Sequence, residues 1–502
     1  MSRQIDEMQD ALAQLMMKRS QYRTICSPIR RMPMELLGRI FGMSLDMPLD
    51  KLGRNDLISL SLVCRSWRSA SLSARSLWSG VVITSCECFD FGFHEIDHMH
   101  DEEYEDVIAW FDRAGGSAKT LEYRLSTTTC RCFKGDRCTI NHPTVKRLIQ
   151  DGPPLYRFSI QVSSVGCLKN WSIFAGSTSA HVLTQSAWTS LHSFSLAFLD
   201  NEDHLWDDGD DSRPSVFNLL PNFSSFDLRL PTRDKAFDDR EDSLDATIRI
   251  PDRILGSIGE FSIVWDWGGN QLLHILPRCA SLTRLSIDLT KSKPFDNPQS
   301  TFLPYPSPQS FITLPNLREF VLSKGDFSIL EVIRTPLLEI MDVEAHGASV
   351  GSQAELGMLR TFIIKSSLSG ILRSLSIRGL VGESGVVDLS LPILSSLQVL
   401  VLDSPHVSSY RFGDPVEVSA EGQSYFKHPS LVELKLMNIR RSRNTLVSEL
   451  WFLKNRRRSN VSCMISVSFH DEPRCSETEL KGRASEASPG HIFVNIYPSP
   501  VI

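Results

Sequence analysis

A group of cysteine and histidine residues lies close enough along the chain to suggest a metal site. It consists of two Cys-x-Cys pairs followed by a cysteine and a histidine, with three more histidines between the pairs: Cys86, Cys88, His94, His98, His100, Cys130, Cys132, Cys138 and His142. Structural zinc needs four ligands in a tetrahedron, and proteins usually supply them as cysteine pairs separated by two to four residues. The pairs here are tighter, and the spacing from Cys138 to His142 fits no standard zinc finger. We therefore expect free cysteines and no bound metal, with zinc as the alternative.

Glycine-rich phosphate-binding loops and catalytic acid–base pairs are other common functional motifs. The chain contains neither a G-x-x-x-x-G-K-[ST] phosphate loop nor a G-x-G-x-x-G dinucleotide loop. The pairs Gly115-Gly116 and Gly268-Gly269 are interpreted as plain turns. We expect no nucleophile with a positioned base, no enzymatic activity and no cofactor.

Composition indicates a globular protein with room for several cores. The chain has 502 residues, of which 41% are apolar and 22% charged, and its length favours roughly two to four domains. A net charge of −6 does not favour nucleic-acid binding, which usually requires a basic surface. No apolar run is long enough to cross a bilayer. The N-terminus lacks the apolar core of a secretory signal, so the 11 cysteines are expected to stay reduced, in the cytoplasm, the nucleus or both.

Residues 25–80 carry two apolar stripes with helical spacing. Pro33 is suited to begin a helix, and Glu35 complements the positive end of its dipole. A second helix is expected to open at Asn55-Asp56 and to run through Cys64 and Trp67, because its apolar residues recur every three or four positions. A module this small leaves roughly two fifths of its surface exposed. Two such stripes therefore predict a partner protein.

The same residues resemble the F-box, the helical motif through which substrate receptors bind the Skp-type adaptor of cullin-based ubiquitin ligases. The resemblance covers residues 30–79 and follows the order Met-Pro-x-Glu-Leu-Leu-x-x-Ile-Phe, then Asp-Leu-x-x-Leu-Ser-Leu-Val-Cys-Arg-x-Trp-Arg, then Leu-Trp. Met32 stands where the family usually has Leu, and residues 44–54 make a longer link between the helices than is usual. The resemblance implies a Skp-type adaptor, and through it a cullin, as partners. The implied adaptor-binding face is Met32, Pro33, Leu36, Leu37, Ile40, Phe41, Leu57, Leu60, Val63, Cys64, Trp67 and Trp78.

Residues 1–24 form a further predicted helix. Their apolar positions alternate at spacings of three and four, the pattern of a coiled-coil seam, but the pattern lasts under three heptads. An isolated helix of this length is marginally stable. We expect an amphipathic helix packed on the F-box-like module, with self-association as the alternative.

From residue 81 to residue 470 one unit, Leu-x-x-Leu-x-Leu, keeps returning with other apolar residues in place of some leucines. Examples are Leu155-Phe158-Ile160, Leu317-Phe320-Leu322, Leu359-Phe362-Ile364 and Leu397-Leu400-Leu402. Stacked short strands of this kind make a continuous core, with helical pieces such as residues 271–276 and 329–333 between them. The predicted fold class is therefore α+β overall: an N-terminal all-α F-box module followed by an irregular α/β leucine-rich-repeat-like solenoid. A generic α/β domain with buried parallel strands is the alternative, because the spacing of the units is irregular.

The residue between the two inward leucines of each strand must point to the opposite side. In a curved solenoid this side is the concave wall, where a target protein would bind. The predicted target-binding residues are Asp288, Val321, Asp342, Ile363, Ser376, Val401 and Lys435.

Several segments interrupt or follow the repeats. Residues 200–213 and 233–245 are acid-rich, and residues 291–310 are rich in Pro and Ser, so all three are expected to be loop insertions. A solvated loop is favoured over a lysine- or metal-binding role for the acidic pair. Residues 439–460 carry a basic helical pattern, which is either a helix face or a split nuclear-import signal. Residues 471–502 are a polar tail in which residues 492–497 could form one more strand.

The functional hypothesis that follows is a substrate receptor of a cullin-based, SCF-type ubiquitin ligase. The F-box-like module would bind the adaptor and the repeats would hold a target protein. The alternative is a repeat scaffold that acts outside any ligase, and a hydrolase hidden in the α/β region is the third class. The sequence does not name the target, its phosphorylation requirement or the oligomeric state.

The cysteine pattern predicts that the purified protein contains no stoichiometric zinc. Elemental analysis of the purified chain measures this directly. One zinc per chain, lost when Cys130 and Cys132 are changed to Ser, would contradict the prediction.

Overall fold

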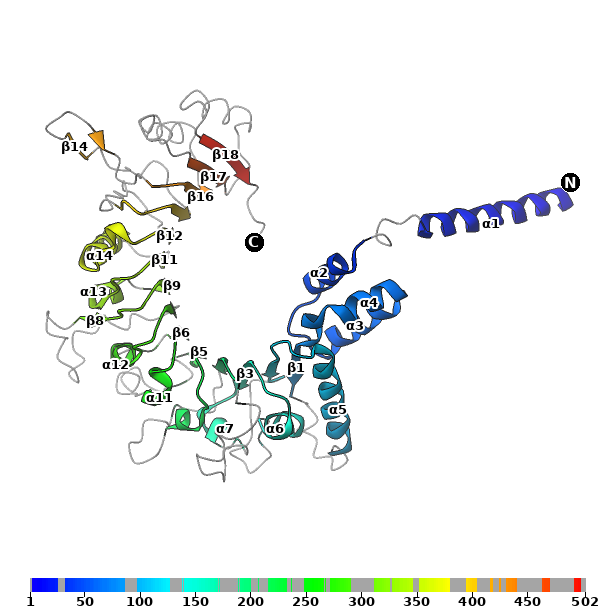
Figure 1. The fold of residues 1–502 in the computed structure, drawn as a ribbon, viewed down its shortest axis with the longest axis horizontal. Helices are drawn as coiled ribbons and strands as arrows, with labels where there is room; N and C mark the ends of the chain where they lie inside the picture. The colour runs from blue at the N-terminus through cyan, green and yellow to red at the C-terminus, as the bar shows by residue number, and fades with distance from the viewer. Residues whose placement is uncertain are drawn as a thin grey trace. The chain divides into compact units, whose positions relative to one another are not determined.

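The computed structural model describes most of the chain in segments. These are residues 2–25, 32–85, 97–126, 138, 140–169, 171, 188, 190–199, 206, 215–232, 236, 248–265, 267, 271–289, 311–325, 327–345, 352–379, 394–403, 416–418, 424–425, 430–439, 463–469 and 492–497. They form two compact units (Figure 1). Unit 1 comprises Met1–Gln161 and Trp171–Leu191, and unit 2 comprises Val162–Asn170 and His192–Ile502. The predicted boundary at residue 80 therefore falls inside unit 1.

The N-terminal segment is helical, as predicted. Helix α1 (Ser2–Ile25) spans 24 residues. Its described side chains from Met8 to Arg19 are all exposed, including Leu12 and Leu15. The expected packing of this helix on the F-box-like module is therefore wrong for these residues, because none of their apolar side chains is covered.

The F-box-like module consists of three helices and a short 3-10 helix. They are α2 (Met34–Ser44), α3 (Lys51–Leu62), α4 (Arg65–Ser73) and η2 (Arg75–Trp78). Helix α2 starts directly after Pro33, as expected. Helix α3 starts before the predicted Asn55, because the Asp50 carboxylate accepts a hydrogen bond from the Gly53 amide at 2.7 Å and caps it there.

The predicted second helix is in fact two helices. Cys64 has extended backbone angles, φ −162° and ψ 169°, so the chain turns between α3 and α4. The turn lets α4 pack on both α2 and α3. Gly38 of α2 permits the close approach, since an added Cβ would lie 2.9 Å from the Ala74 Cβ. Nothing in the local sequence, such as Gly or Pro, marks this break.

The rest of unit 1 is a parallel sheet with covering helices. Its strands pair in chain order: β1 (Gly80–Thr84), β2 (Thr120–Arg124) and β3 (Arg157–Val162). The helices are α5 (Asp97–Ala114) and α6 (Pro143–Asp151), which pack on each other. Inward side chains of the strands, such as Tyr123 and Phe158, are fully buried. The repeat unit Leu155-Phe158-Ile160 marked β3, whereas no repeat unit marked β2.

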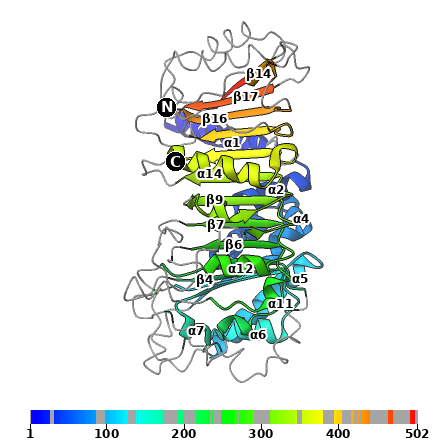
Figure 2. The same cartoon turned by 90° about the vertical axis from the view of Figure 1, so that its left-hand side faces the viewer.

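Unit 2 is built on a parallel sheet whose strands also follow one another in chain order. The strands are β4 (Ser193–Phe198), β5 (Ser225–Arg229), β6 (Glu260–Val264), β7 (Arg284–Asp288), β9 (Glu319–Gly325), β11 (Ile340–Ala345), β12 (Ser374–Arg378), β13 (Val399–Asp403), β16 (Glu433–Ile439), β17 (Cys463–Phe469) and β18 (Ile492–Tyr497). Figure 2 shows these strands stacked as rungs. The strand expected at residues 492–497 is present, and β17 was not predicted.

The described helices of unit 2 lie on one side of this sheet, and none of them covers the other side (Figures 1 and 2). They are α7 (Val165–Lys169), η7 (Val216–Leu219), α11 (Asp252–Leu255), α12 (Gln271–Ile275), η8 (Leu276–Arg278), α13 (Ile329–Val332), α14 (Ser352–Lys365) and η9 (Leu368–Gly370). Two small pairs stand apart from the sheet: β8 (Ile312–Thr313) with β10 (Ile333–Arg334), and β14 (Val416–Val418) with β15 (Ser424–Tyr425).

Side chains along each strand of unit 2 alternate between the buried side and the open side of the sheet. The first inward residues pair in register across the sheet, from Phe194 through Phe226 to Phe261 and on to Leu400 and Leu434. Neighbouring rings stack, with 5.8 Å between the centroids of Phe226 and Phe261. Since every inward residue meets another one on the next strand, the apolar core is continuous along the sheet.

A repeated backbone contact fixes where each strand begins. The carbonyl oxygen of Gly259 accepts hydrogen bonds from the amides of Thr283 and Arg284, at 2.7 and 3.1 Å. The carbonyl of Thr283 does the same for Arg318 and Glu319 at the entrance to β9, and the pattern recurs from His192 to Gln398. Each strand therefore enters the sheet at the same level as its neighbour.

One predicted strand is a helix. The unit Leu359-Phe362-Ile364 lies in α14, where Leu359 and Phe362 are buried and Ile364 is exposed. The three-residue spacing between Leu359 and Phe362 fits one face of a helix as well as the repeat unit, so the motif was ambiguous. The predicted insertion at 291–310, the basic pattern at 440–460 and the tail outside β18 lie outside the described residues.

The register predicts opposite outcomes for two neighbouring residues of β12. Leu375 is fully buried, so Leu375→Ala should lower the free energy of unfolding by about 2–5 kcal/mol. Ser376 points to the open side, and Ser376→Ala should change it by less than about 0.5 kcal/mol. Denaturant unfolding of both variants measures the difference. Equal losses would mean that the strand register is wrong.

Candidate functional site

The predicted adaptor-binding residues divide into a buried group and an exposed group. Leu37, Phe41, Leu57 and Trp78 are buried. Leu36, Ile40 and Val63 are exposed, and so is Pro33. Met32, Leu60, Cys64 and Trp67 are partly exposed.

The buried group forms the core of unit 1 and cannot contact a partner in this structure. Phe41 packs on Trp67 with 5.1 Å between ring centroids. The Trp78 indole donates a hydrogen bond to the Ser71 carbonyl at 2.8 Å, and its ring lies 4.4 Å from that of Trp110 on α5. The prediction that Trp78 belongs to the adaptor face is therefore wrong: its ring joins the module to α5.

The exposed group belongs to a wider set of apolar side chains on α2, α3 and the turn before α4. We call this set the module face, and it consists of Met34, Leu36, Ile40, Met43, Leu52, Ile58, Leu62 and Val63. Leu62 is 72% exposed and Met43 is 87% exposed. Single exposed apolar residues are common, but this many within one small module favour a protein interface. The predicted adaptor-binding set lacked five of these residues: Met34, Met43, Leu52, Ile58 and Leu62.

The link between α2 and α3 attaches the module face to the first strand. Leu49 forms an isolated bridge with Val81 of β1, and the Val82 amide donates to the Leu49 carbonyl at 2.8 Å. Pro48 packs against Gly80, where an added Cβ would lie 2.7 Å from the Pro48 Cβ. Burial lowers the pKa of the Arg54 guanidinium, while Glu103, Asp106 and Asp50 act in the opposite direction. The unusually long link therefore holds the module on the sheet of unit 1.

The second candidate site is the open side of the unit 2 sheet, which we call the open face. Its middle row contains five of the predicted target-binding residues, paired in register from strand to strand: Val321, Asp342, Ser376, Val401 and Lys435. Each is partly exposed. The prediction of one row of outward residues is confirmed for these positions.

Two predicted members of the row are corrected. Asp288 lies on the open face but pairs with Ser323, one row further along the strands. The residue that pairs with Val321 is Ser286, because Ser286 stands between the inward Leu285 and Ile287. Ile363 is only 1% exposed and lies in α14, so it is a core residue on the helix side.

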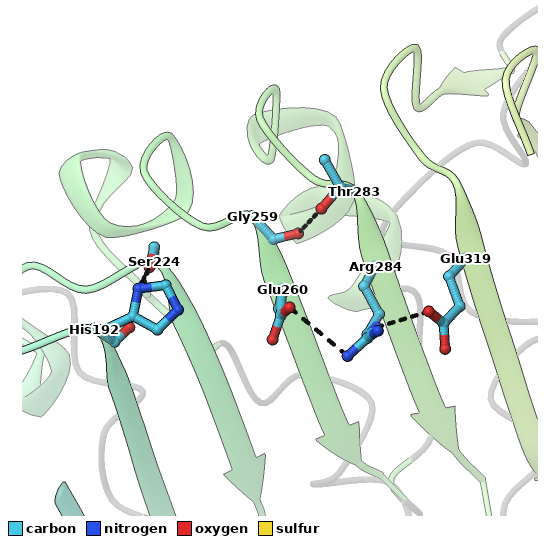
Figure 3. A network of polar contacts seen from close by, with 7 residues as sticks. All are labelled: His192, Ser224, Gly259, Glu260, Thr283, Arg284 and Glu319. Carbon is cyan, nitrogen blue, oxygen red and sulfur yellow. Dashed lines mark hydrogen bonds and ion pairs between the residues drawn. The ribbon is translucent and has the colours of Figure 1, made fainter. Parts of the chain in front are cut away.

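Charged side chains on the open face form bridges between strands. Arg284 lies between two carboxylates, 3.7 Å from Glu260 and 2.8 Å from Glu319 (Figure 3). Arg378 contacts both carboxylate oxygens of Asp342, at 3.0 and 2.9 Å, and lies 3.6 Å from Glu344. Such bridges hold side chains in place on a partly exposed surface, where each single pair adds little stability.

A serine and a histidine lie close together at the start of β5. The Ser224 hydroxyl is 2.6 Å from Nδ1 of His192 and 3.2 Å from the His192 carbonyl oxygen (Figure 3). Thr283 holds the equivalent position on β7, and its hydroxyl donates to the Gly259 carbonyl at 2.9 Å. Because the same contact recurs without a histidine, we interpret Ser224 as part of the repeated strand entrance.

Two short catalytic spacings occur that the expectation of no catalysis did not take into account. They are His94-Glu-Ile-Asp-His98, the H-E-x-x-H spacing, and Gly347-Ala-Ser-Val-Gly351, the G-x-S-x-G spacing. His98 lies on α5, whereas His94 lies outside the described residues. Residues 86–96 and 346–351 lie outside the described part of the chain, so the absence of enzymatic activity stays a prediction.

Most members of the cysteine and histidine group also lie outside the described residues. Within them, no three His, Cys, Asp or Glu side chains are placed to hold a metal. Of the described cysteines, Cys64 is partly exposed and Cys138, Cys167 and Cys279 are buried. Burial raises the pKa of the Cys279 thiol to about 12. Cys279 therefore stays protonated at neutral pH and is a poor nucleophile or metal ligand.

Comparison with known families supports the identity of the module. Residues 29–84 match a family model that is described as F-box-like. The match covers α2 to β1 and includes every residue of the module face. A comparison with curated proteins finds no match. In the described residues, no helix combines the length and the apolar character that crossing a membrane requires.

The position of Trp78 predicts a stability defect when its ring is removed. Trp78→Ala should lower the free energy of unfolding of unit 1 by about 3–5 kcal/mol, because it leaves a cavity beside Trp110. Trp78→Phe keeps an aromatic ring but loses the hydrogen bond to Ser71, so its loss should be smaller. Thermal and denaturant unfolding measure both. A stable Trp78→Ala variant that fails only in adaptor binding would return Trp78 to the interface.

Proposed function

We propose that this chain is a substrate-receptor subunit of an SCF-type ubiquitin ligase. The observation that supports this best is the coincidence of the F-box-like match with an uncovered apolar surface. The module has its own core, so the exposed side chains are not required for its packing. An apolar surface of this kind is stabilised when a partner covers it, at roughly 25 cal/mol per Å².

The proposed adaptor interface is the module face together with Pro33. Leu36, Ile40 and Met43 recur on one side of α2, while Ile58, Leu62 and Val63 extend the surface over α3 and the turn after it. The partner is a Skp-type adaptor, and through it a cullin. This interface leaves out the buried Leu37, Phe41, Leu57 and Trp78 of the sequence-based one and adds exposed neighbours. It also leaves out four partly exposed residues, Met32, Leu60, Cys64 and Trp67.

The proposed target site is the open face of unit 2, which we interpret as an irregular leucine-rich-repeat-like solenoid. Parallel strands in chain order, a continuous inward row and the repeated contact at each strand entrance support this interpretation. The irregular spacing of the units then reflects segments of different length on the helix side, since α14 is far longer than α11.

In this proposal the chain is not an enzyme. It would hold a target near the ubiquitin-charged conjugating enzyme, which raises the effective concentration of a target lysine. The cytoplasm and the nucleus are the proposed compartments, where the cysteines stay reduced. A scaffold outside any ligase remains the competing function, and adaptor binding separates the two.

Charge on the module face is expected to abolish adaptor binding without unfolding the chain. Leu36→Asp with Ile40→Asp should reduce recovery of the Skp-type adaptor in a pull-down by at least tenfold, since a buried unpaired carboxylate is costly. Both side chains are exposed, so the melting temperature should change little.

The matched control is Leu337→Asp, which changes an exposed leucine of unit 2. It should leave adaptor recovery unchanged. Undiminished adaptor binding by the Leu36/Ile40 variant, or by a chain lacking residues 1–79, would refute the proposed interface.

A further inference from the structure

The charges on the open face are unbalanced. Three rows of outward residues run across β6, β7, β9, β11 and β12. The first two rows pair in register from strand to strand, whereas the third is interrupted by a register shift between β9 and β11 after Val343. Their basic residues are Arg284 and Arg378. Their acidic residues are Glu260, Asp288, Glu319, Asp342 and Glu344.

Both arginines are already occupied by acidic neighbours. Arg284 is shared by Glu260 and Glu319, and Arg378 is shared by Asp342 and Glu344. Each group of three side chains therefore keeps a net negative charge. An acidic partner such as a nucleic acid or a phosphorylated segment would have to displace these pairs, whereas a basic partner adds to them.

Aliphatic side chains lie beside the acidic ones. Val321 of β9 pairs with Asp342 of β11, and Val401 of β13 pairs with Ser376 of β12. Ile340 is 43% exposed at the start of β11. Small serines at positions 374 and 376 separate Ile340 and Asp342 from β13. An aliphatic side chain of a partner could therefore pack here while its charged neighbours meet carboxylates.

One described residue of each acid-rich insertion contacts the other. Trp206 and Ala236 each belong to one of the two acid-rich insertions, after β4 and β5. The Trp206 amide donates to the Ala236 carbonyl at 2.9 Å. The Trp206 ring packs on Phe198 and Trp267, with centroids 5.5 and 4.8 Å away. Trp206 and Ala236 are thus held on unit 2, and the acidic residues around them lie outside the described part of the chain.

We infer that the open face selects a basic segment of the target protein, with lysine or arginine side chains next to an aliphatic one. This deepens the proposed function, because it rests on the open face being the target site. The inference specifies a basic target segment and excludes polyanions as ligands of the open face. At physiological salt the attraction reaches about 8 Å, so the segment must lie directly on the face.

The test uses the full chain and short synthetic peptides of defined composition. Fluorescein-labelled peptides carry an aliphatic core flanked by Lys and Arg, by Gln, or by Glu, and a duplex oligonucleotide serves as the polyanion. Fluorescence anisotropy at low and physiological salt measures binding. The basic peptides should bind at least tenfold more tightly than the Gln peptides, and raising the salt concentration should weaken their binding.

The decisive variant is Asp342→Asn with Glu344→Gln, which removes both partners of Arg378. Its binding of basic peptides should fall by about tenfold, as expected for two partly exposed ion pairs. The matched control is Asp252→Asn with Glu331→Gln on helices α11 and α13. It removes two exposed carboxylates on the helix side, one of them paired with Arg278, and should bind as the unchanged chain does.

Three results would overturn the inference. They are basic peptides that bind no better than Gln peptides, a Glu peptide or duplex that binds more tightly, and a decisive variant that binds basic peptides like the control. Skp-type adaptor capture is measured on the same samples. Adaptor binding without basic selectivity overturns this inference alone, whereas loss of adaptor binding by the unchanged chain refutes the proposed function.

Discussion

Unit 2 depends on one repeated backbone constraint, the carbonyl at each strand entrance that accepts two amides from the next strand. The Gly259 carbonyl holds Thr283 and Arg284, and the Thr283 carbonyl in turn holds the start of β9. This contact involves only main-chain atoms, so residues as different as His192, Gly259 and Glu339 can occupy the position. Because each entrance sets the level of the next strand, the inward row stays continuous although the connecting segments differ in length.

The same constraint creates the open face. Once the entrances are level, alternate residues of neighbouring strands meet on the uncovered side, and long side chains such as Arg284 and Arg378 reach carboxylates on adjacent strands. These bridges add little stability at a partly exposed surface. Their consequence is electrostatic: on β6 to β12 they occupy Arg284 and Arg378 and leave acidic character beside Val321 and Ile340.

The F-box-like module faces a different physical problem, because three short helices have too little volume to bury two broad apolar stripes. Packing of α4 on α2 and α3 covers Leu37, Phe41 and Leu57 but leaves Leu36, Ile40 and Leu62 outside. Trp78 and Leu49 then join the module to α5 and β1. The surface left uncovered is the one that an adaptor could cover, and its support on unit 1 keeps it in place.

The sequence by itself determined the identity of the module, the inward and outward positions of most strands, and the middle row from Val321 to Lys435. These features depend on local order and on the alternation of side chains, which a strand cannot avoid. The units Leu317-Phe320-Leu322 and Leu359-Phe362-Ile364 have the same spacing, so periodicity alone could not tell strand from helix. Only tertiary packing placed the second unit in α14.

Tertiary structure also decided which side of each apolar stripe is covered. Leu36 and Leu37 are neighbours of one residue type, yet one is 47% exposed and the other 1%. The turn at Cys64, which has no Gly or Pro to announce it, puts α4 on the Leu37 side of α2. The charge bridges likewise depend on which strands become neighbours. A pattern within one helix or strand shows which residues share a side. Which side is buried, and which charged side chains pair, depends on the elements from other parts of the chain that pack against it.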